Sequence, residues 1–155
     1  SKLPFPDNHF DVVINEAMLT MYADKAKARL LQEYLRVLKP GGRLLTHDIA
    51  LTERREDECV TQEMQAAIHV KAQPMLSDDW LALFRDAGFR DVIRSEGAMT
   101  LMTPKGMLHD EGLAGTLKII RNALKKENRP QFLQMFRHFR QNRDRLRYIA
   151  VVSTK

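Results

Sequence analysis

The sequence predicts an α/β fold with parallel strands, and three consecutive segments carry that prediction. Phe10–Asn15 is a short β-branched run of the kind that forms a buried strand. Lys25–Leu38 places its apolar residues on one helical face, and the Pro-Gly-Gly of residues 40–42 ends that helix. Arg43–Ala50 is a second apolar run typical of a strand. Because a strand, a helix and a strand joined by short connections form a βαβ unit, the two strands should be parallel.

Two polar residues are expected to cap helices at their N-termini. Asp24 stands directly before the first helical stretch. Ser77 stands before another stretch, whose buried face includes Trp80 and Phe84 and which Gly88 ends.

The last third of the chain is predicted to be a strand, two helices and a final strand. The strand covers residues 92–102 and is interrupted by Gly97, and the closing strand covers residues 148–152. The helices occupy residues 104–143, which we interpret as a helical insertion within a single domain of residues 1–155. Four apolar residues of these helices are expected to face the core: Ile120, Leu124, Phe136 and Phe139.

Composition limits the class of protein. The chain has 155 residues, of which 44% are hydrophobic, enough for one globular domain with a real core. No apolar run approaches the roughly 18 residues needed to span a membrane. The single cysteine, Cys59, cannot form an internal disulfide, so nothing indicates secretion and we expect a cytoplasmic protein.

The positive charge is concentrated near the carboxyl terminus. Ten of the residues from Lys118 to Arg147 are Lys or Arg, against two acids, Glu127 and Asp144. Such a stretch can attract nucleic acid, an anionic membrane surface or an acidic substrate. The alternative is that it forms the solvated face of two surface helices.

Three segments, in order, carry a family resemblance. Residues 3–13, LPFPDNHFDVV, resemble the passage of class I S-adenosylmethionine-dependent methyltransferases into their fourth strand. Residues 33–44, EYLRVLKPGGRL, resemble the turn into the fifth strand of that family. Residues 80–89, WLALFRDAGF, resemble the helix before its sixth strand. The chain is most similar to the group that includes the ubiquinone and menaquinone C-methyltransferases.

The resemblance implies a fold, a cofactor and a reaction. The fold is a partial Rossmann-like methyltransferase sheet of strands four to seven, with the last strand antiparallel between the fifth and sixth. The cofactor is S-adenosylmethionine, and the reaction is methyl transfer to a small-molecule acceptor. The seven glycines include no counterpart of the family's Gly-rich cofactor loop. We therefore expect the C-terminal half of a methyltransferase domain, inactive on its own.

Ligands of open α/β sheets bind beyond the carboxyl ends of the strands, which selects residues 15–18 and 47–48. The resemblance places Asn15, Glu16 and Ala17 beside the cofactor. We predict catalytic roles for Glu16 and His47, because a neutral imidazole can accept a phenol or enol proton. The alternative for each is an ordinary hydrogen bond at a strand end.

Three further residues are predicted to contact the substrate: Met18, Asp48 and His109. His47 and Asp48 are adjacent and should point to opposite faces of a regular strand. His109 begins the helical insertion and can form a lid over the cleft, although Asp110 beside it can equally be a simple helix cap. The histidines show no metal-ligand spacing, so no metal is predicted.

Two kinds of partner are considered besides the small-molecule substrate. The apolar, proline-free edge of Phe10–Asn15 should favour a homo-oligomer. The alternative to an enzyme is a non-catalytic binding domain whose basic C-terminal helices contact RNA or another polyanion.

Overall fold

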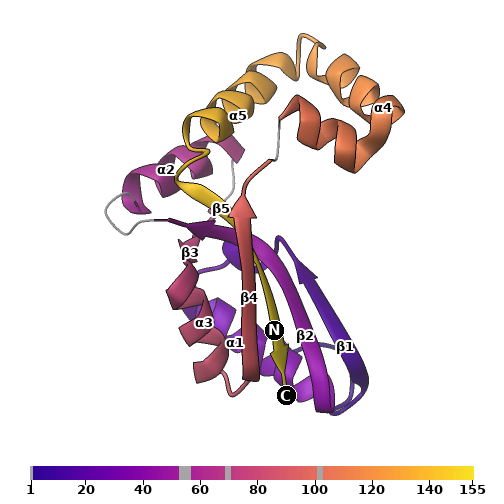
Figure 1. Cartoon of the computed structure of the whole chain (residues 1–155), viewed down its shortest axis with the longest axis vertical. Helices are drawn as coiled ribbons and strands as arrows, with labels where there is room; N and C mark the ends of the chain where they lie inside the picture. Colours follow the sequence, from indigo (N-terminus) through magenta and orange to yellow (C-terminus); the bar gives the residue numbers. More distant parts are fainter. Residues whose placement is uncertain (1, 53–56, 69–70, 101–102) are drawn as a thin grey trace.

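A helical hairpin forms the upper part of the molecule and lies above the carboxyl ends of two parallel strands (Figure 1). The computed structural model describes residues 2–52, 57–68, 71–100 and 103–155. In this part of the chain the strands are β1 (Phe10–Glu16), β2 (Leu38–Leu51), β3 (Met75–Leu76), β4 (Arg90–Ala98) and β5 (Leu146–Thr154). The helices are α1 (Asp24–Val37), α2 (Asp57–Ile68), α3 (Ser77–Asp86), α4 (Pro104–Ala123) and α5 (Arg129–Gln141), with a 3-10 turn, η1, at Leu19–Met21.

The described strands form one mixed sheet in the order β1-β2-β5-β4, with the short β3 paired to β2. β1 and β2 are parallel, whereas β5 is antiparallel to both of its neighbours, β2 and β4. The predicted α/β, Rossmann-like methyltransferase sheet is therefore confirmed, including the antiparallel last strand between the fifth and sixth strands of the family. β3 was not predicted, because two residues are too short for a periodic signal.

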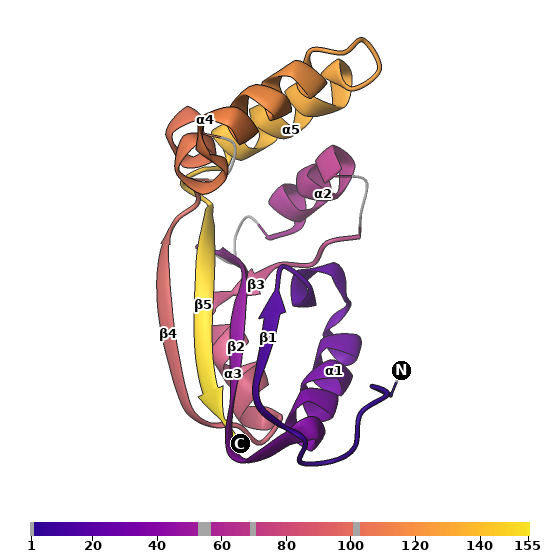
Figure 2. The same cartoon turned by 90° about the vertical axis from the view of Figure 1, so that its right-hand side faces the viewer.

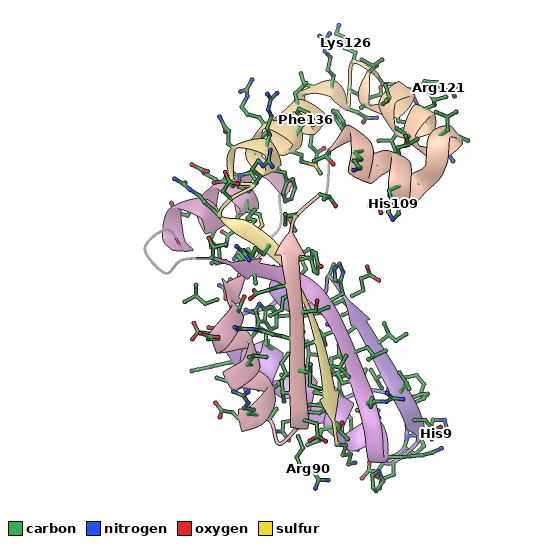
Figure 3. The ribbon with its side chains drawn as sticks, viewed as in Figure 1. His9, Arg90, His109, Arg121, Lys126 and Phe136 are labelled. Carbon is green, nitrogen blue, oxygen red and sulfur yellow. The ribbon has the colours of Figure 1, made fainter. Side chains whose placement is uncertain are left out.

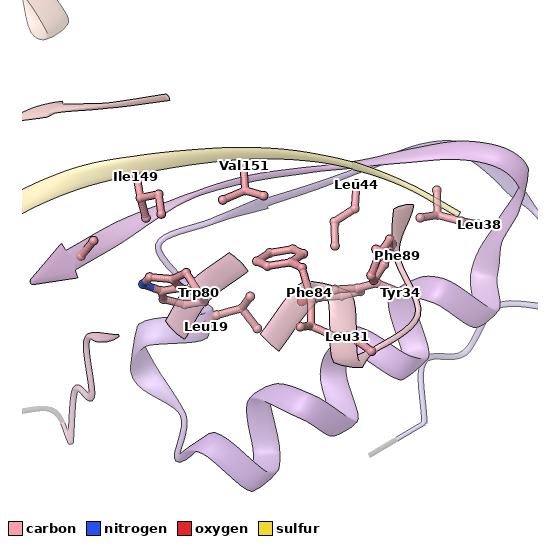
Figure 4. Close-up of a cluster of buried hydrophobic side chains, with 12 residues drawn as sticks. Leu19, Leu31, Tyr34, Leu38, Leu44, Trp80, Phe84, Phe89, Ile149 and Val151 are labelled. Atoms are coloured by element: carbon pink, nitrogen blue, oxygen red, sulfur yellow. The ribbon is translucent and has the colours of Figure 1, made fainter. Parts of the chain in front are cut away.

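α1 and α3 pack against one face of the sheet and form the main core with it (Figures 2 and 4). Trp80 and Phe84 of α3 are fully buried there, as is Leu31 of α1. The indole Nε1 of Trp80 donates a hydrogen bond to the carbonyl of Ile49 at 3.1 Å, so its one polar group is satisfied. This hydrogen bond holds α3 against the carboxyl-terminal part of β2.

The turn between α1 and β2 is tighter than predicted. α1 ends at Val37 and β2 begins at Leu38, so the strand runs through the Pro-Gly-Gly segment rather than starting after it at Arg43. A Cβ on Gly42 would lie 2.9 Å from the carbonyl oxygen of Lys39, which explains why glycine stands at this close approach.

Both predicted N-terminal caps were wrong. Asp24 is the first helical residue of α1, and its carboxylate lies 2.9 Å from Nζ of Lys27 instead of capping the backbone. Ser77 is likewise the first residue of α3, and its hydroxyl donates to Glu96 of β4 at 2.5 Å. In each case a side-chain partner replaced the expected cap.

The third predicted strand corresponds to β4, which ends at Ala98. Its predicted continuation reached residues 101–102, which lie outside the described residues.

α4 and α5 form a hairpin beyond the end of the sheet, and α5 lies beside α2 (Figures 1 and 2). Gly112, with φ 67°, breaks α4 into two helical halves. Phe139 is buried and Phe136 half-buried, but Ile120 and Leu124 are 41% and 68% exposed, so the expectation that these two face the core was wrong. The buried residues of this half of α4 are Thr116 and Ala123, on another side of the helix.

No helix in the described ranges is both long enough and apolar enough to cross a bilayer.

Candidate functional site

A pocket of about 360 Å³ opens where β1 and β2 end, beneath the first half of α4. Its lining combines acidic, aromatic and aliphatic side chains from four strand ends and one helix. The lining residues are Glu16, Ala17, His47, Asp48, Ile49, Met99, Thr100, Asp110 and Tyr148.

Glu16 and His47 face each other across the β1–β2 ladder. They are direct partners in the parallel register, and Nδ1 of His47 lies 3.5 Å from Oε1 of Glu16. The side chains of His47 and Glu16 are 53% and 72% exposed, respectively, so both reach solvent from the face of the sheet opposite α1 and α3. The backbone N–H of Ala17 donates to the carbonyl of His47 at 2.8 Å, which fixes the chain as it leaves β1.

Tyr148 of β5 completes this group of side chains. Its ring centroid lies 5.7 Å from that of His47. Tyr148 pairs with Gly97 on the neighbouring β4, and a Cβ on Gly97 would lie 2.6 Å from the Tyr148 ring. The absence of a side chain at residue 97 therefore leaves room for the ring. Sequence reasoning missed Tyr148 because only the β4–β5 and β2–β5 registers bring it to the site.

Asn15 and Asp48 point to the opposite, covered face, as strand alternation requires. Asn15 is 2% exposed and its Oδ1 accepts a hydrogen bond from the Tyr34 hydroxyl at 3.2 Å. The carboxylate of Asp48 accepts hydrogen bonds from the backbone N–H and the hydroxyl of Thr20, which anchors η1 to β2. Burial raises the pKa of the Tyr34 hydroxyl above its usual value, with smaller contributions from Tyr22 and Asp48.

Two predicted substrate residues do not line the pocket. Met18 precedes η1 and is 43% exposed outside the lining, and His109 lies on α4 with its side chain exposed (Figure 3). The residue next to it, Asp110, lines the pocket instead. Asp110 is not a helix cap either, because the N-cap of α4 is Thr103, whose hydroxyl accepts from the Gly106 N–H at 2.9 Å.

Comparison with known proteins shows what the first third of the chain resembles. Residues 1–46 match the family described as "Methyltransferase domain". Over 44 residues the chain is 61% identical to the ubiquinone/menaquinone biosynthesis C-methyltransferase of Ectopseudomonas mendocina. This alignment covers 28% of the chain and 16% of that enzyme. Over these segments, less than a third of its length, the chain is similar to class I S-adenosylmethionine-dependent methyltransferases.

Longer alignments extend over nearly the whole chain. It is 51% identical over 154 residues to an "uncharacterized protein" of Haemophilus influenzae, covering 99% of the chain and 61% of that relative. The Haemonchus contortus phosphoethanolamine N-methyltransferase 2 in complex with S-adenosyl-L-methionine superposes with a TM-score of 0.64 and 18% identity, covering 97% of this chain and 34% of that one. The cyclase SpnF superposes with a TM-score of 0.65 and 20% identity, covering 99% of this chain and 52% of that one. At these identities the two structures show the shared fold and not a shared reaction.

The three residues predicted to lie beside the cofactor stand at the end of β1 and just beyond it. Glu16 and Ala17 line the pocket at the end of β1. Nδ2 of the buried Asn15 has no hydrogen-bond partner in the described structure, so an acceptor group bound at this strand end would satisfy it. Among the described residues, no cluster of three or more His, Cys, Asp or Glu side chains is arranged to hold a metal ion.

Proposed function

We propose that this chain provides the acceptor-side wall of an S-adenosylmethionine-dependent methyltransferase that acts on a small molecule. The observation that carries the proposal is the Glu16–His47 pair, 3.5 Å apart at adjacent strand ends and open to the pocket. In this proposal His47 is the general base and Glu16 positions it. A pocket of about 360 Å³ is within the range of small-molecule sites.

The acceptor must present an electron pair to the methyl carbon. Bound S-adenosylmethionine supplies the methyl group on a cationic sulfur, which leaves as a neutral thioether. The Glu16 carboxylate favours the tautomer of His47 that carries its proton on Nδ1, which leaves the lone pair of Nε2 free. Nε2 then takes the proton of a phenol or enol, and the electron pair left on the acceptor forms the new bond to the methyl carbon.

The apolar part of the pocket supports an acceptor with a flat or hydrophobic body. Ile49, Met99 and the ring of Tyr148 line it beside the Glu16–His47 pair. Such surfaces exclude water around a developing anion and hold the acceptor in line with the methyl group.

Replacing the pair tests the proposal in a methyltransferase that contains this chain together with the rest of its domain. His47→Ala should lower kcat by about 10²- to 10⁴-fold, the usual contribution of general-base catalysis, and Glu16→Ala by less. The release of S-adenosylhomocysteine with phenolic and enolic acceptors measures turnover. His9→Ala, at the exposed position directly before β1, is the matched control and should keep wild-type rates. Wild-type kinetics in His47→Ala would remove the proposed base.

We also expect the 155-residue chain by itself to bind S-adenosylmethionine weakly and to transfer no methyl group. The reason is that its sequence has no Gly-rich loop, and backbone amides at such a loop normally hold the cofactor. Calorimetric titration of the purified chain measures this affinity. A micromolar dissociation constant would mean that other residues of the chain build the cofactor site.

A further inference from the structure

The second half of α4 exposes a stripe of aliphatic side chains. Leu113, Leu117, Ile120 and Leu124 are 67%, 58%, 41% and 68% exposed, respectively. Their spacing of four, three and four residues places them on one face of the helix. An exposed run of this kind marks an interaction surface rather than ordinary scatter of apolar residues.

This aliphatic stripe is not the face that α4 turns towards α5. Thr116 and Ala123 are the buried residues of this half of α4. Ala123 and Ile119 share a hollow with Phe132 and Met135 of α5, which identifies the side where the two helices approach. In the described structure the stripe is left uncovered on a different side.

A basic row runs directly beside the stripe. Lys118 and Arg121 stand at helical spacing on α4, and Lys125 follows directly after its C-cap, Leu124. A shallow hollow is shared by Leu117, Lys118 and Arg121. Residues 112–126 contain no acid. Among the described residues, none of the three cations is paired with a carboxylate.

We propose that this face of α4 docks on the surface of an anionic phospholipid bilayer. The leucines and Ile120 would enter the boundary between headgroups and acyl chains, while the basic row contacts lipid phosphates. The charge of the row is complementary to such a surface, and the neighbouring stripe supplies the apolar area that interfacial helices bury.

Two other partners fit the face less well. Single-stranded RNA is held by aromatic stacking and polar contacts, and the stripe is aliphatic without an aromatic residue. A second copy of the chain, placed on the same face by two-fold symmetry, would bring two rows of cations together. The anionic bilayer satisfies both the charge and the apolar area.

The position of the hairpin leaves this face accessible. α4 and α5 stand beyond the end of the sheet (Figure 2), and the side chains of Arg121 and Lys126 project from the outer part of the hairpin (Figure 3). The proposal uses none of the pocket residues, so it does not depend on the proposed methyl transfer.

Sedimentation with vesicles tests the proposal on the whole protein, without cofactor or acceptor. Vesicles of phosphatidylcholine alone are compared with vesicles in which about a third of the lipid is phosphatidylglycerol. We expect binding to the anionic vesicles and weakening with salt. The triple variant Lys118→Gln, Arg121→Gln, Lys125→Gln should lose at least about tenfold in partitioning, since each basic residue near such a surface contributes roughly fivefold.

A second variant tests the apolar part, and a third is the control for net charge. Leu117→Ser with Leu124→Ser should also reduce partitioning at least about tenfold, because those side chains would no longer enter the bilayer. Lys25→Gln, Arg29→Gln, Arg85→Gln removes the same charge from exposed positions of α1 and α3 and should bind as wild type. Circular dichroism and the melting temperature of each variant verify that it is folded.

Fluorescence gives an independent readout in chains that keep all three cations of the basic row. Leu117→Trp should show a blue-shifted emission on addition of anionic vesicles, and Arg29→Trp should not. The proposal is overturned if wild type ignores anionic vesicles, or if the charge control loses as much binding as the α4 triple variant. It is also overturned if the serine variant binds as wild type, or if an RNA oligonucleotide is bound while vesicles are not.

Discussion

His138 of α5 is a buried histidine without a full set of hydrogen bonds. Its side chain is 5% exposed, and its Nδ1 lies 3.2 Å from Nδ2 of Asn142 and 3.9 Å from Oε2 of Glu63. The amide of Asn142 can donate to Nδ1, which leaves the proton on Nε2, a buried atom with no partner in the described structure. Burial lowers the pKa of His138, and the Glu63 carboxylate opposes this shift only in part.

The lowered pKa predicts a pH dependence of stability. The unfolded chain takes up a proton at the ordinary histidine pKa of about 6.5, whereas folded His138 resists protonation until lower pH. The unfolded state therefore binds more protons, so this contribution is present above pH 6.5 and is lost as the pH falls towards the folded pKa. Urea unfolding at a series of pH values from 7.5 to 5 should show this decline, and His138→Gln should flatten it. His9→Ala, at an exposed position, should keep the wild-type slope; an unchanged slope in His138→Gln would contradict the assignment.

At the scale of residues, the sequence indicated the strand ends where the pocket lies but not its full lining. The rule that ligands bind at strand ends selected residues 15–18 and 47–48, of which Glu16, Ala17, His47 and Asp48 line the pocket and Asn15 and Met18 do not. Their roles stay predictions. Tyr148 could not be selected, because its place beside His47 depends on the register of an antiparallel strand about a hundred residues further along the chain.

At the scale of elements, the β4–β5 pair controls the shape of the pocket through Gly97. A Cβ at this position would lie 2.6 Å from the ring of Tyr148, so Gly97→Ala must displace that ring from its place near His47. The ring is the movable end of a side chain, and we therefore expect a fall in melting temperature of only a few degrees. In a methyltransferase that contains this chain, turnover should fall more clearly, on the order of tenfold, because the proposed acceptor wall shifts.

A double-mutant cycle measures whether Gly97 acts through Tyr148. In a Tyr148→Ala background the added methyl group meets no ring, so Gly97→Ala should change turnover little further. An equal loss in both backgrounds would show that the effect of residue 97 comes from the β4 backbone instead.

The helices show which of their features can be predicted from the sequence and which depend on neighbouring elements. Periodicity identified an apolar face on α4, but it cannot say whether a neighbouring element covers that face, and Leu124 is 68% exposed. Capping rules treat a helix as isolated, whereas Asp24 and Ser77 found partners in Lys27 and Glu96. Order and direction of the main strands followed from the βαβ pattern and from the family resemblance, because both are properties of long segments.

At the scale of the whole molecule, the described helices cover one face of the sheet and leave much of the other open. α1 and α3 lie on the covered face (Figure 2). Across the open face the ladder places one apolar row on four adjacent strands: Ile14, Leu45, Val152 and Ile93. Ile14 and Ile93 are 72% and 66% exposed, which leaves an apolar area of the kind that favours association.

The edge of the sheet adds a second reason for association. Among the described strands, β1 pairs only with β2, so its other side presents free N–H and C=O groups on a strand without proline. The β1–β2 register shifts between Phe10 and Val12, but Val12 and Ile14, which follow this irregularity, are exposed. Another chain can therefore pair with β1 at the edge or pack over the apolar row on the open face.

We predict that the 155-residue chain self-associates, most simply as a two-fold dimer, because an isologous contact can pair the β1 edges or bury the apolar rows of two copies. Gel filtration with light scattering at micromolar concentration measures the mass. Ile14→Lys should shift the population towards the 18.0 kDa monomer, since a charge at this position opposes both strand pairing and burial. Leu124→Lys places the same change on the stripe of α4 and should leave the association intact. A wild-type monomer that binds no hydrophobic dye would contradict the prediction, because it would require the edge and the open face to be protected within a single chain.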